Sequence, residues 1–157
     1  SSDLDEIVSD SHPIHEVFPF ILLKTTVTNN ICNCVCQELR IPLYRPTRYR
    51  NIFKKSPKEW LRRIKNSDFI ITDSFHGLAF SLIFHRNFLV LCADEKKFTR
   101  LQSLLRLLNM EERYVRSFED LKSRICLIHK NVDYKKVDGI LKRERVKSLD
   151  FLKTNLS

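Results

Sequence analysis

The residues best suited to chemistry lie in one short turn with the sequence Asp-Ser-Phe-His-Gly, residues 73–77. An apolar run before the turn predicts a strand, and an apolar run after it predicts a helix. The first turn of a helix carries unpaired N–H groups and a partial positive charge, so it attracts anions. Ser74 can donate to a phosphate, Gly77 would let a ligand approach the backbone, and His76 can bind and protonate an oxyanion. The turn is therefore a candidate anion-binding site.

The same residue types also have a purely structural explanation. Ser74 could be only a helix N-cap, His76 could be satisfied by a nearby carbonyl, and Gly77 could serve the turn alone. Residue types by themselves do not separate the two interpretations.

The elements that must position this turn alternate between strands and helices. Strands are predicted at 17–23, 41–44, 68–72, 88–92 and, as a short edge strand, 114–115; helices are predicted at 30–40, from Ser56, at 78–85 and at 99–109. Such alternation predicts an α/β fold with a Rossmann-like, doubly wound, mainly parallel sheet. Ligands of these sheets bind beyond the carboxyl ends of the strands, which is where the turn would lie.

Helix signals at two places complete the expected domain organisation. Ser56-Pro57-Lys58-Glu59 has the pattern of a capping box with proline at the first helical position. A stripe of apolar residues among Lys and Arg in the tail predicts an amphipathic C-terminal helix that docks on the domain. We therefore expect a polar N-terminal segment at 1–16, a Rossmann-like donor-binding domain at 17–132 and a docking helix at 133–157.

Positive charge is concentrated in one part of the chain. The sequence has 28 Lys and Arg against 19 Asp and Glu, a net charge of +9, and ten of the basic residues lie between Arg40 and Lys65 beside a single acid, Glu59. This excess favours an anionic partner, whether a phosphorylated small molecule, a nucleic acid or an acidic lipid surface, although a solvated basic face is equally compatible with it. The segment Arg45–Lys55 predicts peripheral contact with the inner face of a membrane.

The five cysteines are expected to be reduced thiols. They are odd in number, three are spaced two apart at Cys32, Cys34 and Cys36, and no histidine lies near these three. We predict no metal and no cofactor. The acidic N-terminus is unlike a secretory signal and no apolar run could span a bilayer, so we expect a cytoplasmic location; the first residue is not Met, so we expect a piece of a longer protein.

From Ser56 to Val115 the sequence resembles the polysaccharide pyruvyl transferase family, in its C-terminal half. The resemblance rests on Ser56-Pro57, on the segment from Asp68 through the Ser-Phe-His-Gly turn, and on the apolar helix and strand through Leu91. Weaker points of likeness are Arg100 with Leu104-Leu105, Arg113, and the tail residues Val137, Leu141, Ser148 and Leu152.

The resemblance implies a transferase that moves the enolpyruvyl group of phosphoenolpyruvate to two hydroxyls of a sugar, in surface or exopolysaccharide biosynthesis. It implies one half of a glycosyltransferase-B-like architecture, with a preceding N-terminal domain of the same enzyme as partner and a glycan or lipid-linked sugar as acceptor. His76 would be the catalytic residue, with Ser74, Phe75, Gly77 and Arg100 binding the donor. A fragment of this kind would be inactive alone.

Three alternatives remain open at this stage. A basic nucleic-acid-binding module is suggested by Tyr44, Arg45, Arg48, Tyr49, Arg50 and Phe53, although no recognised nucleic-acid motif accompanies them. The donor half of another glycosyltransferase-like enzyme would have the same fold, but no Gly-rich phosphate loop is present. The domain could also be an inactive scaffold. Independently of these alternatives, Arg100 could be an ordinary surface arginine.

Overall fold

A parallel sheet forms the centre of the domain in the computed structural model, which describes residues 6–7, 9, 11–45, 56–92 and 95–144, with only the backbone at 95–99. The four strands are β1 (Ile14–Phe20), β2 (Ser67–Thr72), β3 (Asn87–Leu91) and β4 (Tyr114–Val115), and they lie in the order β1-β2-β3-β4, all parallel. The helices are α2 (Thr26–Leu39), α3 (Pro57–Asn66), α4 (Phe75–Ile83), α5 (Glu95–Leu107), α6 (Phe118–Ser123), α7 (Cys126–His129) and α8 (Tyr134–Arg143), with a 3-10 turn, η2, at Glu111–Arg113.

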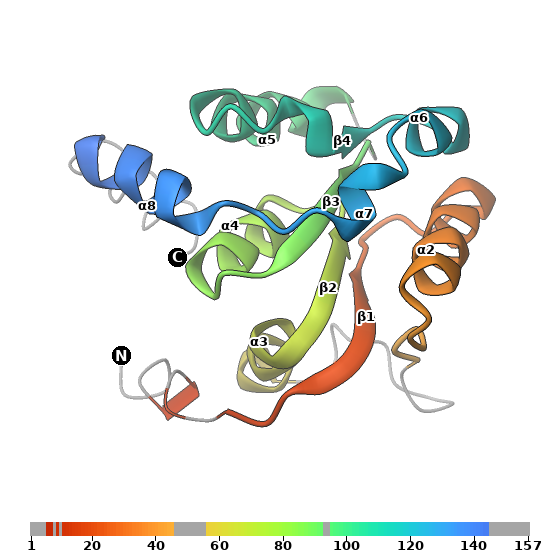
Figure 1. Ribbon diagram of the computed structural model, residues 1–157, viewed down its shortest axis with the longest axis horizontal. Helices are drawn as coiled ribbons and strands as arrows, with labels where there is room; N and C mark the ends of the chain where they lie inside the picture. The colour runs from red at the N-terminus through yellow and green to blue at the C-terminus, as the bar shows by residue number, and fades with distance from the viewer. Residues whose placement is uncertain (1–5, 8, 10, 46–55, 93–94, 145–157) are drawn as a thin grey trace.

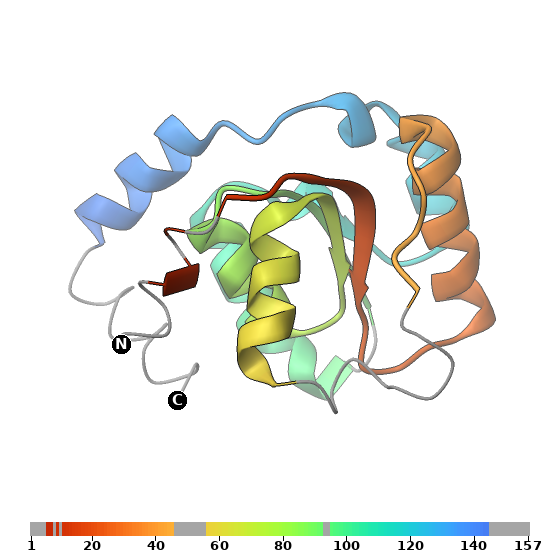
Figure 2. The ribbon, with the colours of Figure 1, turned by 90° about the horizontal axis from the view of Figure 1, so that it is seen from below.

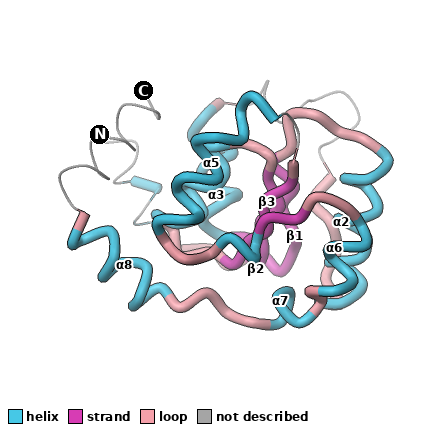
Figure 3. The backbone as a smooth tube through the Cα atoms, turned by 90° about the horizontal axis from the view of Figure 1, so that it is seen from above, coloured by secondary structure: helices cyan, strands magenta, loops and turns pink. Residues whose placement is uncertain are grey.

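Helices cover both faces of the sheet, as the predicted Rossmann-like fold requires (Figure 1). One buried cluster joins Phe18, Ile70 and Phe88 to helices α3, α4, α5 and α8, and the other joins Val17, Ile71 and Leu89 to helices α2, α6 and α7. Alternate residues of each strand therefore pack on opposite faces, which explains why the strand sequences are continuously apolar. Figure 3 shows α2 and α6 on one side of the strands and α3 and α5 on the other. The predicted fold class is confirmed.

The segment predicted as a second strand at 41–44 is shorter than expected. Only Leu43 forms a bridge, parallel to Val17, through hydrogen bonds from the Val17 N–H to the Pro42 carbonyl (2.9 Å) and from the Tyr44 N–H to the Val17 carbonyl (2.8 Å). Pro42 has no N–H to donate, which limits the pairing this segment can make.

This bridge shows where the chain order of the sheet reverses. It adds the 41–44 segment on the outer side of β1, whereas β2 lies on the inner side, so the order of the chain reverses between β1 and β2. The helices after β1 and β2 accordingly pack on opposite faces. In sheets of this kind the crevice outside the carboxyl ends of the two strands at the reversal is the usual ligand site.

Helix α3 begins where the sequence predicted it, whereas α2, α4 and α5 begin three or four residues before their predicted positions. Ser56 precedes α3 and Pro57 is its first residue, but the Ser56 side chain makes no capping hydrogen bond, so the predicted capping box is wrong. The capping box of this domain is instead at α2, where the Thr28 N–H donates to the Thr25 hydroxyl (3.2 Å) and the Thr25 N–H donates to the Thr28 hydroxyl (2.8 Å). That pair starts α2 four residues before the predicted helix.

The N-terminal segment and the tail both pack on the domain. Ile7 is fully buried, its carbonyl accepts from Nζ of Lys65 (2.6 Å), and β1 begins three residues before the predicted boundary at 17. Val137 of α8 is 3% exposed and joins the core cluster, and the Tyr134 hydroxyl donates to the carbonyls of Ser81 (3.1 Å) and Arg86. Figure 2 shows α8 at the periphery, joined to α7 by an extended segment. The rest of the tail, 145–157, lies outside the described residues.

Three cations of α3 form ion pairs with two glutamates of the domain. Lys58 and Arg62 both pair with Glu6 (2.5 and 3.0 Å), and Arg63 pairs with Glu16 (2.6 Å) while its guanidinium lies over the Tyr44 ring. These pairs reduce the positive field that α3 can offer to a nucleic acid. The basic segment 45–55, apart from Arg45, lies outside the described residues.

Candidate functional site

The Ser-Phe-His-Gly turn begins α4 at the carboxyl end of β2. Ser74 is the N-cap: its Oγ accepts from the His76 N–H (3.2 Å), and its carbonyl accepts from the Leu78 N–H (3.1 Å). His76 therefore stands at the second position of the helix, where the partial positive charge of the helix is concentrated. Ser74 is 6% exposed and His76 is half-buried, so the histidine is the more accessible of the two.

Thr72 and Asp73 join this turn to the loop after β1. The Thr72 hydroxyl donates to the Phe20 carbonyl (2.7 Å) and accepts from the Ser74 N–H (3.0 Å). The two carboxylate oxygens of Asp73 accept from the N–H groups of Leu22 (2.8 Å) and Leu23 (3.0 Å). The ends of the two strands at the reversal are thus held together by side chains, which fixes the turn against the loop after β1.

Replacing Asp73 by Asn should loosen this connection. An amide keeps one acceptor oxygen but turns an NH₂ group toward the second backbone N–H, and bonds to a charged acceptor contribute about 1.5–3 kcal/mol each. We expect Asp73→Asn to lower the free energy of unfolding by about 1–2 kcal/mol, measured by urea denaturation. Amide exchange of Leu22 and Leu23 should also become faster.

Asp68 provides the matched control for this substitution. It lies at the opposite end of β2, its side chain is 39% exposed, and its partner His15 is 79% exposed. Exposed pairs contribute about 0–1 kcal/mol, so Asp68→Asn should change stability little. Equal losses for the two variants would contradict the bracing role of Asp73.

Gly77 is required by packing rather than by backbone conformation. Its φ is not positive, and a Cβ built at this position would lie 2.1 Å from Oγ1 of Thr72, 2.7 Å from Cβ of Thr72 and 3.0 Å from Cδ1 of Phe20. The absence of a side chain therefore lets α4 lie close to the carboxyl ends of β1 and β2. The sequence had suggested close approach of a ligand; the close approach seen here is that of the strands.

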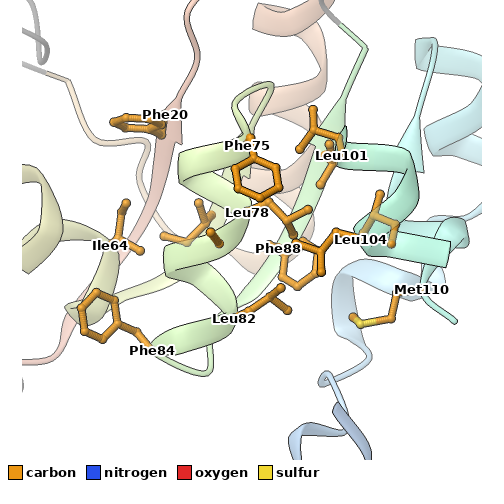
Figure 4. Packing of buried hydrophobic residues seen from close by; sticks show 14 of the residues in the cluster. Phe20, Ile64, Phe75, Leu78, Leu82, Phe84, Phe88, Leu101, Leu104 and Met110 are labelled. Atoms are coloured by element: carbon orange, nitrogen blue, oxygen red, sulfur yellow. The ribbon is translucent and has the colours of Figure 1, made fainter. Parts of the chain in front are cut away.

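Phe75 and Arg100 meet beside the turn. The Phe75 ring is 6% exposed and packs among Leu78, Leu101 and other residues of the core cluster (Figure 4), and the Arg100 guanidinium carbon lies 5.2 Å from the ring centroid. The contact places the exposed Arg100 of α5 next to the first turn of α4. Phe75 acts in this arrangement as a support for Arg100.

All five predicted site residues therefore gather at one end of the sheet, and the structure adds two that the prediction left out. Thr72 and Asp73 make the hydrogen bonds that position the turn. The available sequence signal was the pair of short polar residues at the end of an apolar strand, Thr72 as its last residue and Asp73 directly after it. Their bonds reach residues about fifty positions away, which no local pattern indicates.

Arg113, one of the weaker points of the family resemblance, has a structural role. Its side chain is buried under β3 and α7, where it donates to the carbonyls of Phe88 (3.0 Å) and Lys130 (2.7 Å), and burial lowers its pKa. These bonds stabilise the region between β3, β4 and the segment that leads to α8.

The cysteines of α2 lie away from the turn, and the described cysteines are free thiols. Burial raises the pKa of the Cys32 thiol to about 12 and also raises the pKa values of Cys34 and Cys36. Such thiols stay protonated at neutral pH and are poor nucleophiles. In the described ranges, no group of three or more His, Cys, Asp or Glu side chains could hold a metal ion.

Comparison with protein families gives one result. The family model described as polysaccharide pyruvyl transferase matches residues 8–91, more than half of the chain. This chain belongs to the polysaccharide pyruvyl transferase family. The match includes β1, β2 and the whole Ser74–Gly77 turn, so the site residues on the turn lie within the family region, whereas Arg100 lies beyond its end.

Searches of curated proteins and of solved structures gave no match. The pyruvyl transferase assignment therefore rests on the family model and on the fold. Among the helices that the structure describes, none has the length and apolar character needed to cross a bilayer.

Proposed function

We propose that this chain binds phosphoenolpyruvate at the carboxyl ends of β1 and β2 and takes part in the transfer of its enolpyruvyl group to a glycan. The observation that carries the proposal is the place of the Ser74–Gly77 turn: it starts a helix at the point where the order of the sheet reverses. Membership of the pyruvyl transferase family supplies the reaction class. A helix N-terminus, a histidine and an arginine are groups suited to a phosphate and a carboxylate.

The reaction places clear demands on such a site. The bond from C2 of phosphoenolpyruvate to the phosphate oxygen breaks, and two sugar oxygens form bonds to C2. Of the two protons that leave the sugar hydroxyls, one ends on the methylene carbon, which becomes a methyl group, and the other ends on the departing phosphate. The protein must therefore stabilise the phosphate and deliver a proton to it.

The described residues can be assigned to these tasks. The positive end of α4 would attract the phosphate, and His76 would donate the proton as it leaves, a general-acid contribution of about 10²–10⁴-fold. Arg100, held on the Phe75 ring, would bind the carboxylate or phosphate through its planar guanidinium. Thr72, Asp73 and Gly77 would keep the helix start against the strands.

A titration of amide NMR spectra with phosphoenolpyruvate, with sulfate in parallel, tests the proposal. Shifts should concentrate at residues 73–78 and around Arg100 and should be larger with phosphoenolpyruvate, because sulfate has no carboxylate. Binding near 1 mM corresponds to about −4 kcal/mol, which NMR detects readily.

Substitution of Arg100 makes this test specific. Arg100→Gln should weaken phosphoenolpyruvate binding about tenfold. Unchanged sulfate binding would then assign Arg100 to the carboxylate, and a parallel loss of sulfate binding would assign it to the phosphate. Arg106, on the same helix and with a side chain 64% exposed, provides the control: Arg106→Gln should bind both ions as the unmodified chain does. Identical shifts with sulfate and phosphoenolpyruvate would contradict a donor site and leave a general anion site.

A further inference from the structure

A pocket lies at the β4 edge of the sheet. It has a volume of about 260 Å³ and lies between α5 and α6, which flank β4 in Figure 1. Its polar and aromatic lining consists of Gln102, Glu111, Tyr114, Arg116, Asp120 and Arg124. No residue of the candidate donor site contributes to it.

The fold fixes the lining in place. Nη1 of Arg124 donates to the carbonyls of Glu112 (3.2 Å) and Tyr114 (2.8 Å), so this arginine satisfies backbone acceptors at the edge strand. The N–H of Arg116 donates to Oδ2 of Asp120 (3.1 Å), and the Arg116 guanidinium lies over the Tyr114 ring at 5.6 Å. Hydrogen bonds and a cation–π contact among the lining residues therefore fix the shape of the pocket.

The chemistry of the lining indicates what it would bind. Two arginines are balanced by two carboxylates, Glu111 and Asp120, so the pocket has no net excess of positive charge. An isolated phosphate would favour cations alone. A ligand with several hydroxyls, each able to donate and accept, matches the mixed set, since guanidinium and amide groups donate while carboxylates accept. The volume is close to the lower end of small-molecule pockets, at about 300 Å³, which suits a single sugar unit.

Helix α5 connects this pocket to the donor site. Arg100 of α5 contacts Phe75 at the donor site, whereas Gln102, two residues later, lines the pocket. A chain of sugar units is long enough to engage two sites on either side of one helix, and a second contact raises the effective concentration of the first.

We propose that the pocket at β4 binds one hydroxyl-rich sugar unit of the glycan whose hydroxyls accept the pyruvyl group. The inference rests on the proposed function for its choice of ligand. Arg116, Gln102 and Asp120 hydrogen-bond the sugar hydroxyls, and the buried Tyr114 ring supports the Arg116 guanidinium that lies over it.

The test uses the whole 157-residue chain and defined probes: methyl galactoside, methyl glucoside and inorganic phosphate, each titrated while amide NMR spectra are recorded. A methyl glycoside should shift Gln102, Tyr114, Arg116 and Asp120, and phosphate should not. Arg116→Gln should weaken the glycoside at least tenfold. Arg143→Gln, an exposed change on α8, is the control and should leave binding unchanged. Arg124 is left intact because it supports β4.

Each outcome decides the inference separately from the donor-site proposal. If glycosides shift the pocket and Arg116→Gln removes the effect, the sugar subsite is supported even where phosphoenolpyruvate does not bind at residues 73–78. If neither glycoside shifts the signals of the pocket residues, with or without a shift from phosphate, the sugar subsite is overturned. The donor-site proposal is then still judged by the phosphoenolpyruvate titration alone.

Discussion

Replacing Gly77 by Ala should lower the free energy of unfolding by about 3 kcal/mol or more, at the upper end of the range for overpacked cores. The added Cβ would lie 2.1 Å from Oγ1 and 2.7 Å from Cβ of Thr72, which real carbon atoms do not tolerate. Thr72 is fully buried and bonded to the Phe20 carbonyl, so its side chain cannot rotate away without losing that bond. Either α4 must move outward or the hydrogen bond from the Thr72 hydroxyl to the Phe20 carbonyl of β1 must break.

Thermal unfolding followed by circular dichroism measures this effect. A loss of about 3 kcal/mol in a chain of this length corresponds to a fall in Tm of roughly 6–12 °C. If α4 moves outward to relieve the contact, the first turn of the helix moves with it, so the same variant should also lose its response to phosphoenolpyruvate.

Gly139, the other glycine of the chain, is the matched control. It lies within α8, and a Cβ there would have nothing within 4 Å. Alanine is the better helix former by about 1 kcal/mol, so Gly139→Ala should leave stability unchanged or raise it. If both variants unfolded at the temperature of the unmodified chain, the close packing of α4 on β2 would be wrong.

The strands could be predicted because they contain continuous apolar runs, as expected for strands buried on both faces. Runs such as Phe69-Ile70-Ile71 and Phe88-Leu89-Val90-Leu91 are apolar at every position, and only a strand covered on both faces buries all of them. The Tyr114-Val115 edge strand was likewise predicted and is present as β4. The place of the 41–44 segment in the sheet was harder to predict, since it depends on the bridge at Leu43, a contact of two hydrogen bonds.

Helix starts were harder to predict because a capping pattern in the sequence allows the side-chain hydrogen bonds of a cap but does not ensure that they form. Ser56 and Glu59 have the pattern of a capping box, yet the Ser56 side chain makes no such bond, and the start of α3 is instead tied to Glu6 through Lys58. Thr25 and Thr28 cap each other, although the second residue is not the usual Glu or Gln.

The candidate site was predictable in its location but not in its construction. The Ser-Phe-His-Gly turn was identified from residue types and from its place between a strand and a helix. The contacts of Asp73 with Leu22 and Leu23, and of Phe75 with Arg100, join parts of the chain that only the folded structure brings together. Packing, rather than a ligand, accounts for Gly77, because the nearest atoms to its missing side chain belong to Thr72 and Phe20.

Substitution of His76 by Gln should lower the rate of transfer from phosphoenolpyruvate by about 10²–10⁴-fold, the usual contribution of a general acid. Glutamine can still form hydrogen bonds, but it cannot deliver a proton to the departing phosphate. Release of inorganic phosphate in the presence of a glycan acceptor measures the rate, in an enzyme that includes the N-terminal domain implied by the family resemblance. Because only proton delivery is removed, kcat should fall while the dissociation constant of phosphoenolpyruvate changes by a few-fold at most.

His85 lies near the opposite end of α4 and gives this experiment its control. It is 50% exposed, pairs with Asp138 (3.0 Å) and stacks on Tyr134, far along the helix from the turn. His85→Gln should leave the rate and the binding of phosphoenolpyruvate unchanged. A His76→Gln variant that retained the full rate would exclude proton donation by this residue. If binding were lost together with the rate, His76 would be a phosphate ligand, and the proton would have to come from another group at the carboxyl ends of β1 and β2.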